Sequence, residues 1–300
     1  MSDFRIQASV ESFEVRSADG LAIRAHKVGH GPHHWLIPPG QGTPLLCWKH
    51  VFDRFGDRMT MVTWDQRGCY GSGRPKRRRD LAFERHVEDG LAVIDALGWD
   101  EPFVTGSWSM GVQLGLALYE RMPERIRALT LINGAFANVL TTAYGPSFTA
   151  PLFRLALDGT VLASPVLTPL ARSLLRSGRV GAVMDRLAVS TANAAFVTAI
   201  TRELASLDMG TYFAILRGLD RHSCDHVVER VQVPTLITAG TKDVATPPAV
   251  MQRLHGRIVN SDYVLFERGT HYTPLEYPEK LNAALERFFA ERVFEPDFCR

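Results

Sequence analysis

The chain has 300 residues, of which 46% are hydrophobic and 22% charged, and its formal net charge is +2 at pH 7. This length and composition favour one large folded core, and so small a net charge argues against a nucleic-acid partner. No apolar run approaches the roughly 20 residues of a membrane span, and the N-terminus does not open a signal peptide, so we expect no membrane span. The scattered cysteines, without a disulfide framework, predict a reducing, cytoplasmic location; they are Cys47, Cys69, Cys224 and Cys299.

The first half of the chain alternates between predicted strands and predicted helices. A loose arm, residues 1–10, precedes a hairpin whose strands, 11–16 and 21–28, flank the turn Asp19–Gly20. The elements expected next are a strand at 34–37, a helix at about 45–55, a strand at 59–64, a helix at about 83–97, a strand at 102–105, a helix at 110–121 and a strand at 126–132. This alternation predicts an α/β fold with a mostly parallel sheet covered by helices on both faces.

The alternation stops at about residue 136 and resumes after residue 230. The intervening segment is rich in Ala, Leu and Val with helical spacing, which predicts an inserted helical cap, 136–230, on a core made of 1–135 and 231–300. The core then ends with a strand at 234–239, a helix near 247–254, a strand at 263–266 and an amphipathic helix at about 278–293. We expect apolar side chains to line a substrate pocket beneath the cap, although packing within the cap is the alternative for each; they are Trp108, Phe148, Phe153, Phe196 and Phe213, with Leu152 and Leu162 as further candidates.

The segment Thr105–Gly111, Thr-Gly-Ser-Trp-Ser-Met-Gly, joins a predicted strand to a predicted helix. A serine on such a sharp turn is typical of a nucleophile, and the residues two positions away on either side must be small. Ser107 and Gly111 occupy these positions around Ser109. The alternative nucleophile, Ser107, would place the β-branched Thr105 in a crowded position, so we favour Ser109.

A serine hydroxyl needs a base and an orienting acid to become a nucleophile. Asp243 and His271 each follow the carboxyl end of a predicted strand, where open parallel sheets place their sites. Taken singly, Asp243 fits a helix N-cap and His271 an ordinary histidine. The polar cluster Asp220, His222, Asp225 and His226 follows no predicted strand and matches no familiar zinc spacing, so we assign it neither a catalytic nor a metal-binding role.

Three sequence motifs in the correct order, the serine turn Thr105–Gly111 and two motifs downstream of it, resemble the α/β-hydrolase family, and a fourth motif lies upstream. Gly240–Pro247 resembles the family's G-x-x-D-x-x-x-P, Thr270–Pro278 resembles G-H-x-x-x-x-E-x-P, and Trp64–Gly73 is close to D-x-R-G-x-G-x-S. The resemblance implies that Ser109, Asp243 and His271 form a catalytic triad, with no metal and no organic cofactor.

The family also stabilises the oxyanion of the reaction with two backbone N–H groups. Met110, directly after the nucleophile, should provide one of them. The other should come from the loop 38–42, where the family usually carries His-Gly and this chain carries Pro39-Gly40. The resemblance implies that Gln41 provides this second N–H; neither Pro38 nor Pro39 could provide it, because proline has no N–H.

The motifs predict a serine hydrolase that cleaves a carboxylic ester-type bond of a small to medium, largely apolar substrate. A thioesterase, a carbon–carbon bond hydrolase and a hydrolase-fold receptor for a small ligand would keep the same motifs. A proline iminopeptidase-like enzyme is a further alternative, and Glu203 and Asp208 are candidates for binding its substrate amine. The basic run Arg74–Arg79 fits a solvated loop, or a site for a phosphate, a coenzyme A tail or an acidic carrier. The oligomeric state stays open.

Overall fold

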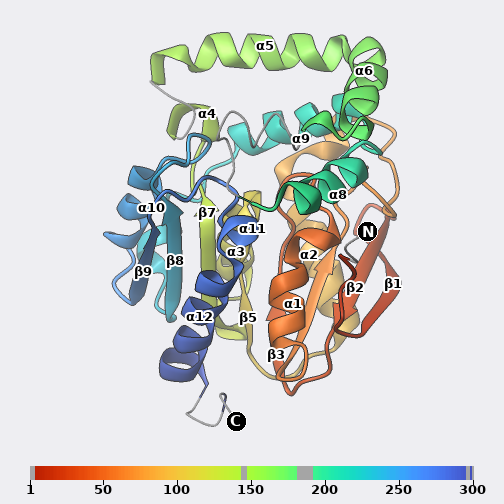
Figure 1. Ribbon diagram of the computed structural model, residues 1–300. Coiled ribbons are helices and arrows are strands. Elements are labelled where there is room, and N and C mark those ends of the chain that lie inside the picture. Colours follow the sequence, from red (N-terminus) through yellow and green to blue (C-terminus); the bar gives the residue numbers. More distant parts are fainter. Residues whose placement is uncertain (1–3, 143–146, 181–191, 295–297, 299–300) are drawn as a thin grey trace.

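The computed structural model describes residues 4–142, 147–180, 192–294 and 298. Within these residues nine strands form one sheet, in the order β1-β2-β4-β3-β5-β7-β8-β9 with β6 beside β7 (Figure 1). The hairpin β1–β2 and the pair β2–β4 are antiparallel, and all other neighbours are parallel, which confirms the predicted fold class. The strands are β1 (Val10–Arg16), β2 (Ala22–Val28), β3 (His33–Leu36), β4 (Met59–Trp64), β5 (Phe103–Thr105), β6 (Trp108–Ser109), β7 (Ile126–Gly134), β8 (Thr235–Gly240) and β9 (Ser261–Phe266).

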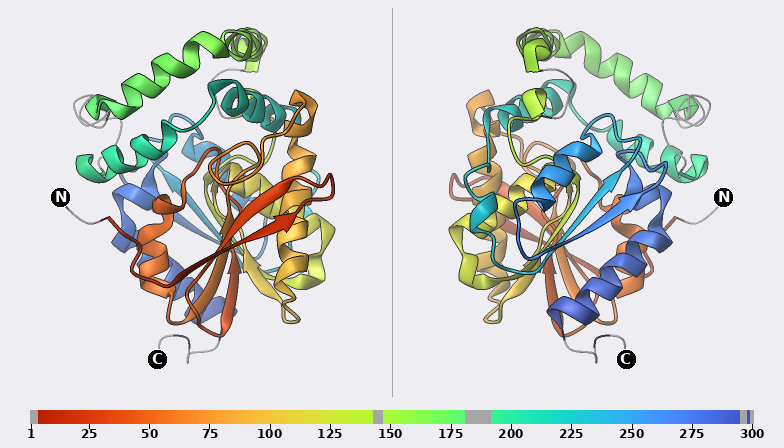
Figure 2. Two further views of the ribbon diagram at one scale, coloured as in Figure 1. Left: turned by 90° about the vertical axis from the view of Figure 1, so that its right-hand side faces the viewer. Right: turned by 90° about the vertical axis from the view of Figure 1, so that its left-hand side faces the viewer.

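Helices cover both faces of the sheet (Figures 1 and 2). The helices α1 and α12 pack on one face, and α2, α3 and α10 pack on the other. They are α1 (Lys49–Phe55), which continues a 3-10 turn, η1 (Leu45–Trp48), together with α2 (Phe83–Leu97), α3 (Met110–Arg121), α10 (Pro248–His255), the short α11 (Thr273–Glu276) and α12 (Pro278–Phe288). Further 3-10 turns are η2 (Arg78–Leu81), η3 (Pro123–Arg125) and η5 (Val228–Arg230). The final predicted helix is shorter than expected, because it ends at Phe288 and continues as a π-helical turn, Phe289–Val293.

Successive side chains of the strands pack alternately into two separate hydrophobic cores, one on each face of the sheet. Trp35 and Ile37 point to the face covered by α1 and α12, whereas Leu36 between them points to the face covered by α2 and α3. Successive strand residues face opposite sides of a sheet, so an almost continuous apolar run buries both sides. All six residues of β4 are buried for this reason.

Between β7 and β8 the described chain holds helices and no strand. These helices lie beyond the ends of the parallel strands, with α5 and α6 outermost (Figures 1 and 2). We propose that this segment, 136–230, is the inserted cap on a core of 1–135 and 231–300. Its elements are α4 (Val139–Thr142), η4 (Ser147–Thr149), α5 (Ala150–Leu162), α6 (Ser164–Arg176), α8 (Ala194–Leu204) and α9 (Met209–Arg221).

No single helix in the described ranges is long and apolar enough to cross a membrane. The pair α5 and α6 reaches that length and composition only when both helices are taken together, and an 87° bend separates them.

The N-terminal arm, as far as the structure describes it from residue 4, packs against the core and is not a loose segment. The backbone N–H groups of Gln7 and Ala8 donate to Asp53 Oδ1 at 2.6 and 3.1 Å. The ring of Phe4 lies 5.1 Å from that of Phe196, between centroids. Hydrogen bonds and aromatic packing therefore fix a segment that has no regular secondary structure.

A buried ion pair holds the turn after β4. The Arg67 guanidinium donates from Nε and Nη2 to the two carboxylate oxygens of Asp89 on α2, at 2.8 and 2.6 Å. Its Nη1 donates to Asp19 Oδ2 in the β1–β2 hairpin at 2.9 Å. Because the side chains of Arg67 and Asp89 are fully buried, each charge depends on the other for compensation.

Replacing Arg67 should therefore destabilise the fold strongly. We expect Arg67→Met to lower the free energy of unfolding by about 3–5 kcal/mol, because it leaves the Asp89 carboxylate buried without a partner. Urea unfolding at neutral pH measures this loss. The control is Arg85→Met, which removes a half-exposed pair with Glu88 and should cost less than about 1 kcal/mol. Similar losses in the two variants would contradict the assignment.

Candidate active site

Ser109 sits on a strained turn between β6 and α3. Its backbone angles are φ 62° and ψ −121°, a conformation that residues other than glycine rarely adopt. The neighbours must be small: a Cβ added at Gly111 would lie 2.6 Å from the Pro38 carbonyl oxygen and 2.6 Å from Ser107 Cβ. A Cβ added at Gly134 would lie 2.6 Å from the carbonyl oxygen of Ser109. The turn therefore presents the Ser109 side chain at the end of the sheet.

The structure brings Ser109, His271 and Asp243 together in one hydrogen-bonded chain. Ser109 Oγ lies 3.0 Å from His271 Nε2, and His271 Nδ1 lies 2.9 Å from Asp243 Oδ2. In the tautomer that carries its proton on Nδ1, Nε2 accepts the Ser109 hydroxyl and Nδ1–H donates to the Asp243 carboxylate. A nucleophile, a base and an orienting acid need this order of contacts.

Asp243 is buried, yet its surroundings favour the charged form. Its Oδ1 accepts the backbone N–H groups of Ala245 and Thr246 at 2.9 and 2.7 Å, and its Oδ2 accepts the Thr246 hydroxyl at 2.8 Å. Burial by itself would raise the pKa of Asp243, but the hydrogen bond and charge of His271 and the donors of Thr246 outweigh it, so the pKa lies below its usual value. The carboxylate is therefore ionised at neutral pH.

Asn133, at the end of β7, is a supporting residue that the sequence analysis missed. Its Nδ2 donates to the Thr270 carbonyl at 3.1 Å and to Asp243 Oδ2 at 3.3 Å. Its Oδ1 accepts the hydroxyls of Thr238 and Thr273 at 3.1 and 2.7 Å. The available signal is Asn133-Gly134 at a strand end, since asparagine tolerates the positive φ of 40° found there.

A small cavity lies directly over Ser109. It holds about 20 Å³, roughly the space of one water molecule. The structure thus places both predicted oxyanion donors beside the serine. The residues that line it are Gln41, Ser109, Met110, Gln113, Ala135, Val139, Leu216, Leu219 and Thr246.

Both donor positions are fixed by neighbouring residues. Met110 is the first residue of α3, where a backbone N–H has no partner within its own helix. The loop that carries Gln41 is tied to α9, because Gln41 Nε2 donates to the Tyr212 carbonyl at 2.8 Å. The next residue, Gly42, donates its N–H to Gln66 Oε1 at 2.6 Å. The motif Trp64–Gly73 therefore stabilises the loop and does not line the cavity.

The five aromatic residues expected in a substrate pocket do not line this cavity. Phe148 and Phe153 are 81% and 45% exposed, because they lie on the outer side of η4 and α5. Phe196 is buried against His50 and Phe4 instead. Phe213 packs edge-on against Tyr212. Trp108 has a positioning contact, since its Nε1 donates to the carbonyl oxygen of His271 at 2.7 Å.

The further pocket candidates Leu152 and Leu162 are also exposed, on the outer side of α5. Helical spacing does not distinguish a side chain that faces a cavity from one that faces solvent, and this explains the difference from the expectation.

The polar cluster at residues 220–226 serves four separate contacts. Asp220 pairs with Arg154 at 2.7 Å, and Asp225 pairs with Arg257 at 2.6 Å. His222 Nδ1 lies 2.9 Å from Gln113 Oε1, and His226 Nε2 lies 2.8 Å from Glu120. Asp220 therefore joins α9 to α5, and the other three side chains join the turn after α9 to the core.

Comparisons with known proteins agree with this fold. The sequence model of the alpha/beta hydrolase fold family matches residues 36–278. Pimeloyl-[acyl-carrier protein] methyl ester esterase of Neisseria meningitidis serogroup A is 27% identical over 254 residues, covering 82% of this chain and 74% of that protein. Serine hydrolase BPHL of Mus musculus is 27% identical over 277 residues, covering 91% and 84%. The structure of an esterase from Exiguobacterium antarcticum superposes with a TM-score of 0.75 at 17% identity, covering 92% and 98%.

The crowding around the turn gives a direct test. We expect Gly111→Ala to destabilise the protein by more than about 2 kcal/mol, because the new methyl group must displace the Pro38 backbone or Ser107. Gly159→Ala, in the middle of α5 with nothing within 4 Å of the added Cβ, is the matched control and should stabilise by about 0.5–1 kcal/mol. Chemical unfolding compares them, and a Gly111→Ala protein as stable as the wild type would refute the packing described.

Proposed function

Because the chain belongs to the α/β-hydrolase fold family, we propose that it is a serine hydrolase cleaving carboxylic ester-type bonds of small to medium, largely apolar substrates. The chain is an enzyme, since its relatives are named as hydrolases and esterases. The observation that carries the proposal is the 3.0 Å contact between Ser109 Oγ and His271 Nε2, backed by the buried Asp243 carboxylate.

The proposed reaction has two halves. Ser109 Oγ attacks the ester carbonyl carbon while His271 Nε2 takes the hydroxyl proton, and the tetrahedral intermediate forms. His271 then returns this proton to the departing alkoxide, which leaves as the alcohol, and an acyl group remains on Ser109. A water molecule gives a proton to His271 and attacks the acyl carbon. Collapse of this second intermediate frees the carboxylic acid and restores the serine hydroxyl.

The negative charge of each intermediate falls on the former carbonyl oxygen. The backbone N–H groups of Met110 and Gln41 are the proposed donors to it. Asp243 keeps the imidazole in the tautomer that accepts at Nε2, and it stabilises the imidazolium that forms. The lowered pKa of Asp243 keeps its carboxylate ionised at neutral pH, which this role requires.

The side chains that line the cavity favour a substrate with an apolar acyl group. Ala135, Val139, Leu216 and Leu219 line it, and no acidic side chain does so among the described residues. Of the two carboxylates considered for binding a peptide amine, Asp208 caps α9 by accepting the Thr211 N–H at 2.7 Å. This observation favours esters over aminopeptidase substrates. A space of about 20 Å³ admits no ester, so we infer that α9 moves when substrate enters.

Free thiols support the proposed cytoplasmic location. Cys47, Cys69 and Cys224 are buried without disulfides. Burial raises the pKa of Cys69 to about 12, so this thiol stays protonated and unreactive at neutral pH.

Hydrolysis of a series of p-nitrophenyl esters tests the nucleophile. We expect Ser109→Ala to lower kcat by at least about a thousandfold while the protein stays folded, because the attacking oxygen is lost. The control is Ser107→Ala, which removes a buried hydroxyl two residues away and should keep most of the activity. Equal losses in both variants would show that the turn, and not its nucleophile, had been damaged. No turnover by folded wild type would contradict the ester hypothesis.

The same ester series tests the cavity wall. Leu216→Ala should shift the preference toward longer acyl chains, since it removes apolar volume from the side that α9 provides. A several-fold rise in the ratio of kcat/KM for a long chain to that for a short one is the expected result. Leu174→Ala, on the exposed side of α6, should leave this ratio unchanged. An unchanged ratio for Leu216→Ala would place the acyl group elsewhere.

A further inference from the structure

The outer side of the helices α5 and α6 exposes an unusual number of large apolar side chains. Six aliphatic residues are 57–72% exposed, and their spacing of three and seven residues on α5 and of four residues on α6 makes one apolar stripe per helix. We call these six residues the outer face; they are Leu152, Leu155, Leu162, Val166, Leu170 and Leu174. Contiguous apolar surface of this kind marks a binding surface in water-soluble proteins.

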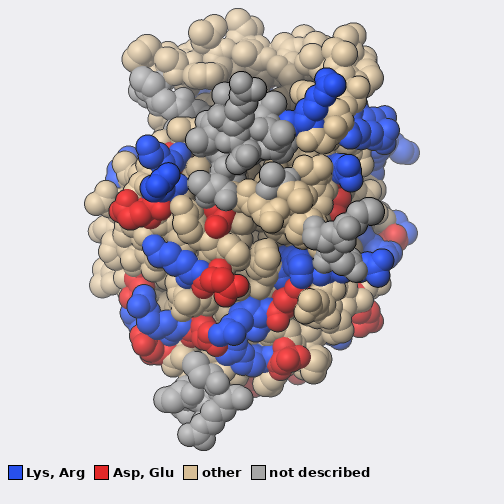
Figure 3. All heavy atoms as spheres, viewed as in Figure 1, with Lys and Arg blue, Asp and Glu red and all other residues tan. Residues whose placement is uncertain are grey.

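Three of the four charged side chains of the two helices make contacts with α9 or with the chain just before it. Arg154 pairs with Asp220 at 2.7 Å, and Asp158 lies 3.2 Å from Arg217, both toward α9. Arg172 Nε donates to the Ala205 carbonyl at 3.1 Å. Figure 3 shows the result from one side: the part of the molecule formed by these helices is almost free of charged residues, which crowd the body below it.

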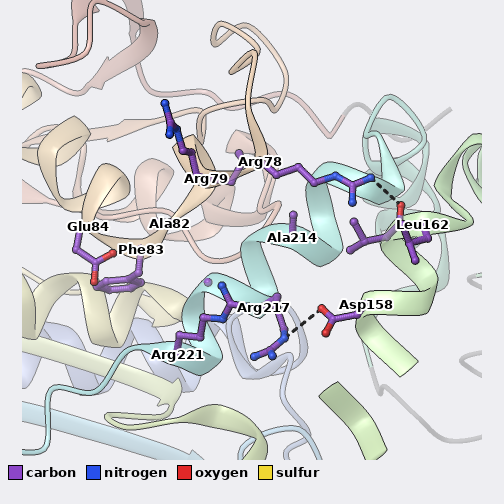
Figure 4. Close-up of a pocket in the computed structure, with 13 residues that line it drawn as sticks. Arg78, Arg79, Ala82, Phe83, Glu84, Asp158, Leu162, Ala214, Arg217 and Arg221 are labelled. Atoms are coloured by element: carbon purple, nitrogen blue, oxygen red, sulfur yellow. Dashed lines mark hydrogen bonds and ion pairs between the residues drawn. The ribbon is translucent and has the colours of Figure 1, made fainter. Parts of the chain in front are cut away.

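A cationic rim borders the outer face. Arg78 Nη2 donates to the carbonyl oxygen of Val161 on α5 at 3.4 Å, and this contact places the basic run 74–79 beside that helix (Figure 4). The five cations of this run are all exposed. A cavity of about 480 Å³ lies at the junction, with Leu81, Val161 and Leu162 among its lining residues and Arg217 and Arg221 on its α9 side.

We propose that the outer face and its cationic rim dock this protein on a lipid surface with anionic headgroups. An apolar stripe sinks into the interface of a bilayer, and exposed lysine and arginine side chains beside it bind the headgroups. The bend supports docking over crossing: each helix has 13 residues, about 20 Å, and the two turn by 87°.

A second copy of this chain is the less favourable occupant. Pairing two outer faces would bring the exposed cations of one basic run toward those of the other copy, and like charges at an interface oppose association. An anionic surface complements both the apolar stripes and the charge. The proposal is independent of the catalytic proposal, because binding to vesicles is measured without any turnover.

Co-sedimentation of the full chain with vesicles tests the docking. We expect wild type to sediment with vesicles made of equal parts phosphatidylglycerol and phosphatidylcholine, and to stay in solution with phosphatidylcholine alone. Leu155→Glu/Leu170→Glu should weaken binding at least about tenfold, because two charges enter the apolar stripes. Val259→Glu is the control, since Val259 is a fully exposed aliphatic residue in the turn before β9.

A second pair of variants tests the cationic rim separately. Arg77→Gln/Arg79→Gln should weaken binding to the anionic vesicles by about tenfold or more, at roughly 1 kcal/mol for each cation lost. Arg253→Gln/Arg287→Gln removes the same charge from exposed positions on α10 and α12 and should bind as wild type does. Arg78 is kept because it contacts α5. Circular dichroism and hydrolysis of a short water-soluble ester verify that every variant is folded.

Three results would overturn the proposal. Wild type that fails to sediment with anionic vesicles has no such surface. Binding that survives Leu155→Glu/Leu170→Glu does not use the outer face. A dimer in analytical ultracentrifugation that these two substitutions abolish, without vesicle binding by the wild type, would assign the outer face to a second copy of the chain.

Discussion

The backbone of Ser109 is the constraint on which the rest of the site depends. A positive φ on a serine persists only where its surroundings leave the chain no relaxed alternative. Here that restraint comes from close packing: Gly111 lies against Pro38, and Gly134 lies against the Ser109 carbonyl. The same crowding sets the loop 38–42 and the first turn of α3 on either side of the serine. The nucleophile and both proposed oxyanion donors are thus positioned by one packed turn.

Two groups of contacts hold the site, one from the ends of the strands and one from α9. On the core side, Asp243 and Asn133 join the ends of β7 and β8 to the loop after β9 through buried hydrogen bonds, which hold His271 against Ser109. On the opposite side, α9 closes the cavity through apolar contacts and one hydrogen bond from Gln41. The outer helices α5 and α6 are attached to α9 by hydrogen bonds.

The pattern of apolar residues along the strands made the sheet predictable from the sequence. The contacts that support the site were not predictable, because they join residues that only folding brings together. The strand expected at 59–64 is β4, because a short unbroken apolar run between two turns is typical of a buried strand. Ser109, Asp243 and His271, which the structure joins by hydrogen bonds, could be proposed from the sequence because each follows a strand in a family motif. Asn133 could not, since its partners lie more than 100 residues away in the sequence. The exposure of Phe148 and Phe153 could not be predicted either, because the sequence pattern of an apolar stripe is the same whether the stripe packs on protein or faces solvent.

Covalent labelling with a fluorophosphonate, which phosphonylates activated serines, tests the central claim most directly. Intact-protein and peptide mass spectrometry should find one adduct per chain, on Ser109, and His271→Ala should label far more slowly because the hydroxyl loses its base. Labelling of a different serine, or none in the folded wild type, would contradict the assignment of Ser109 as the nucleophile.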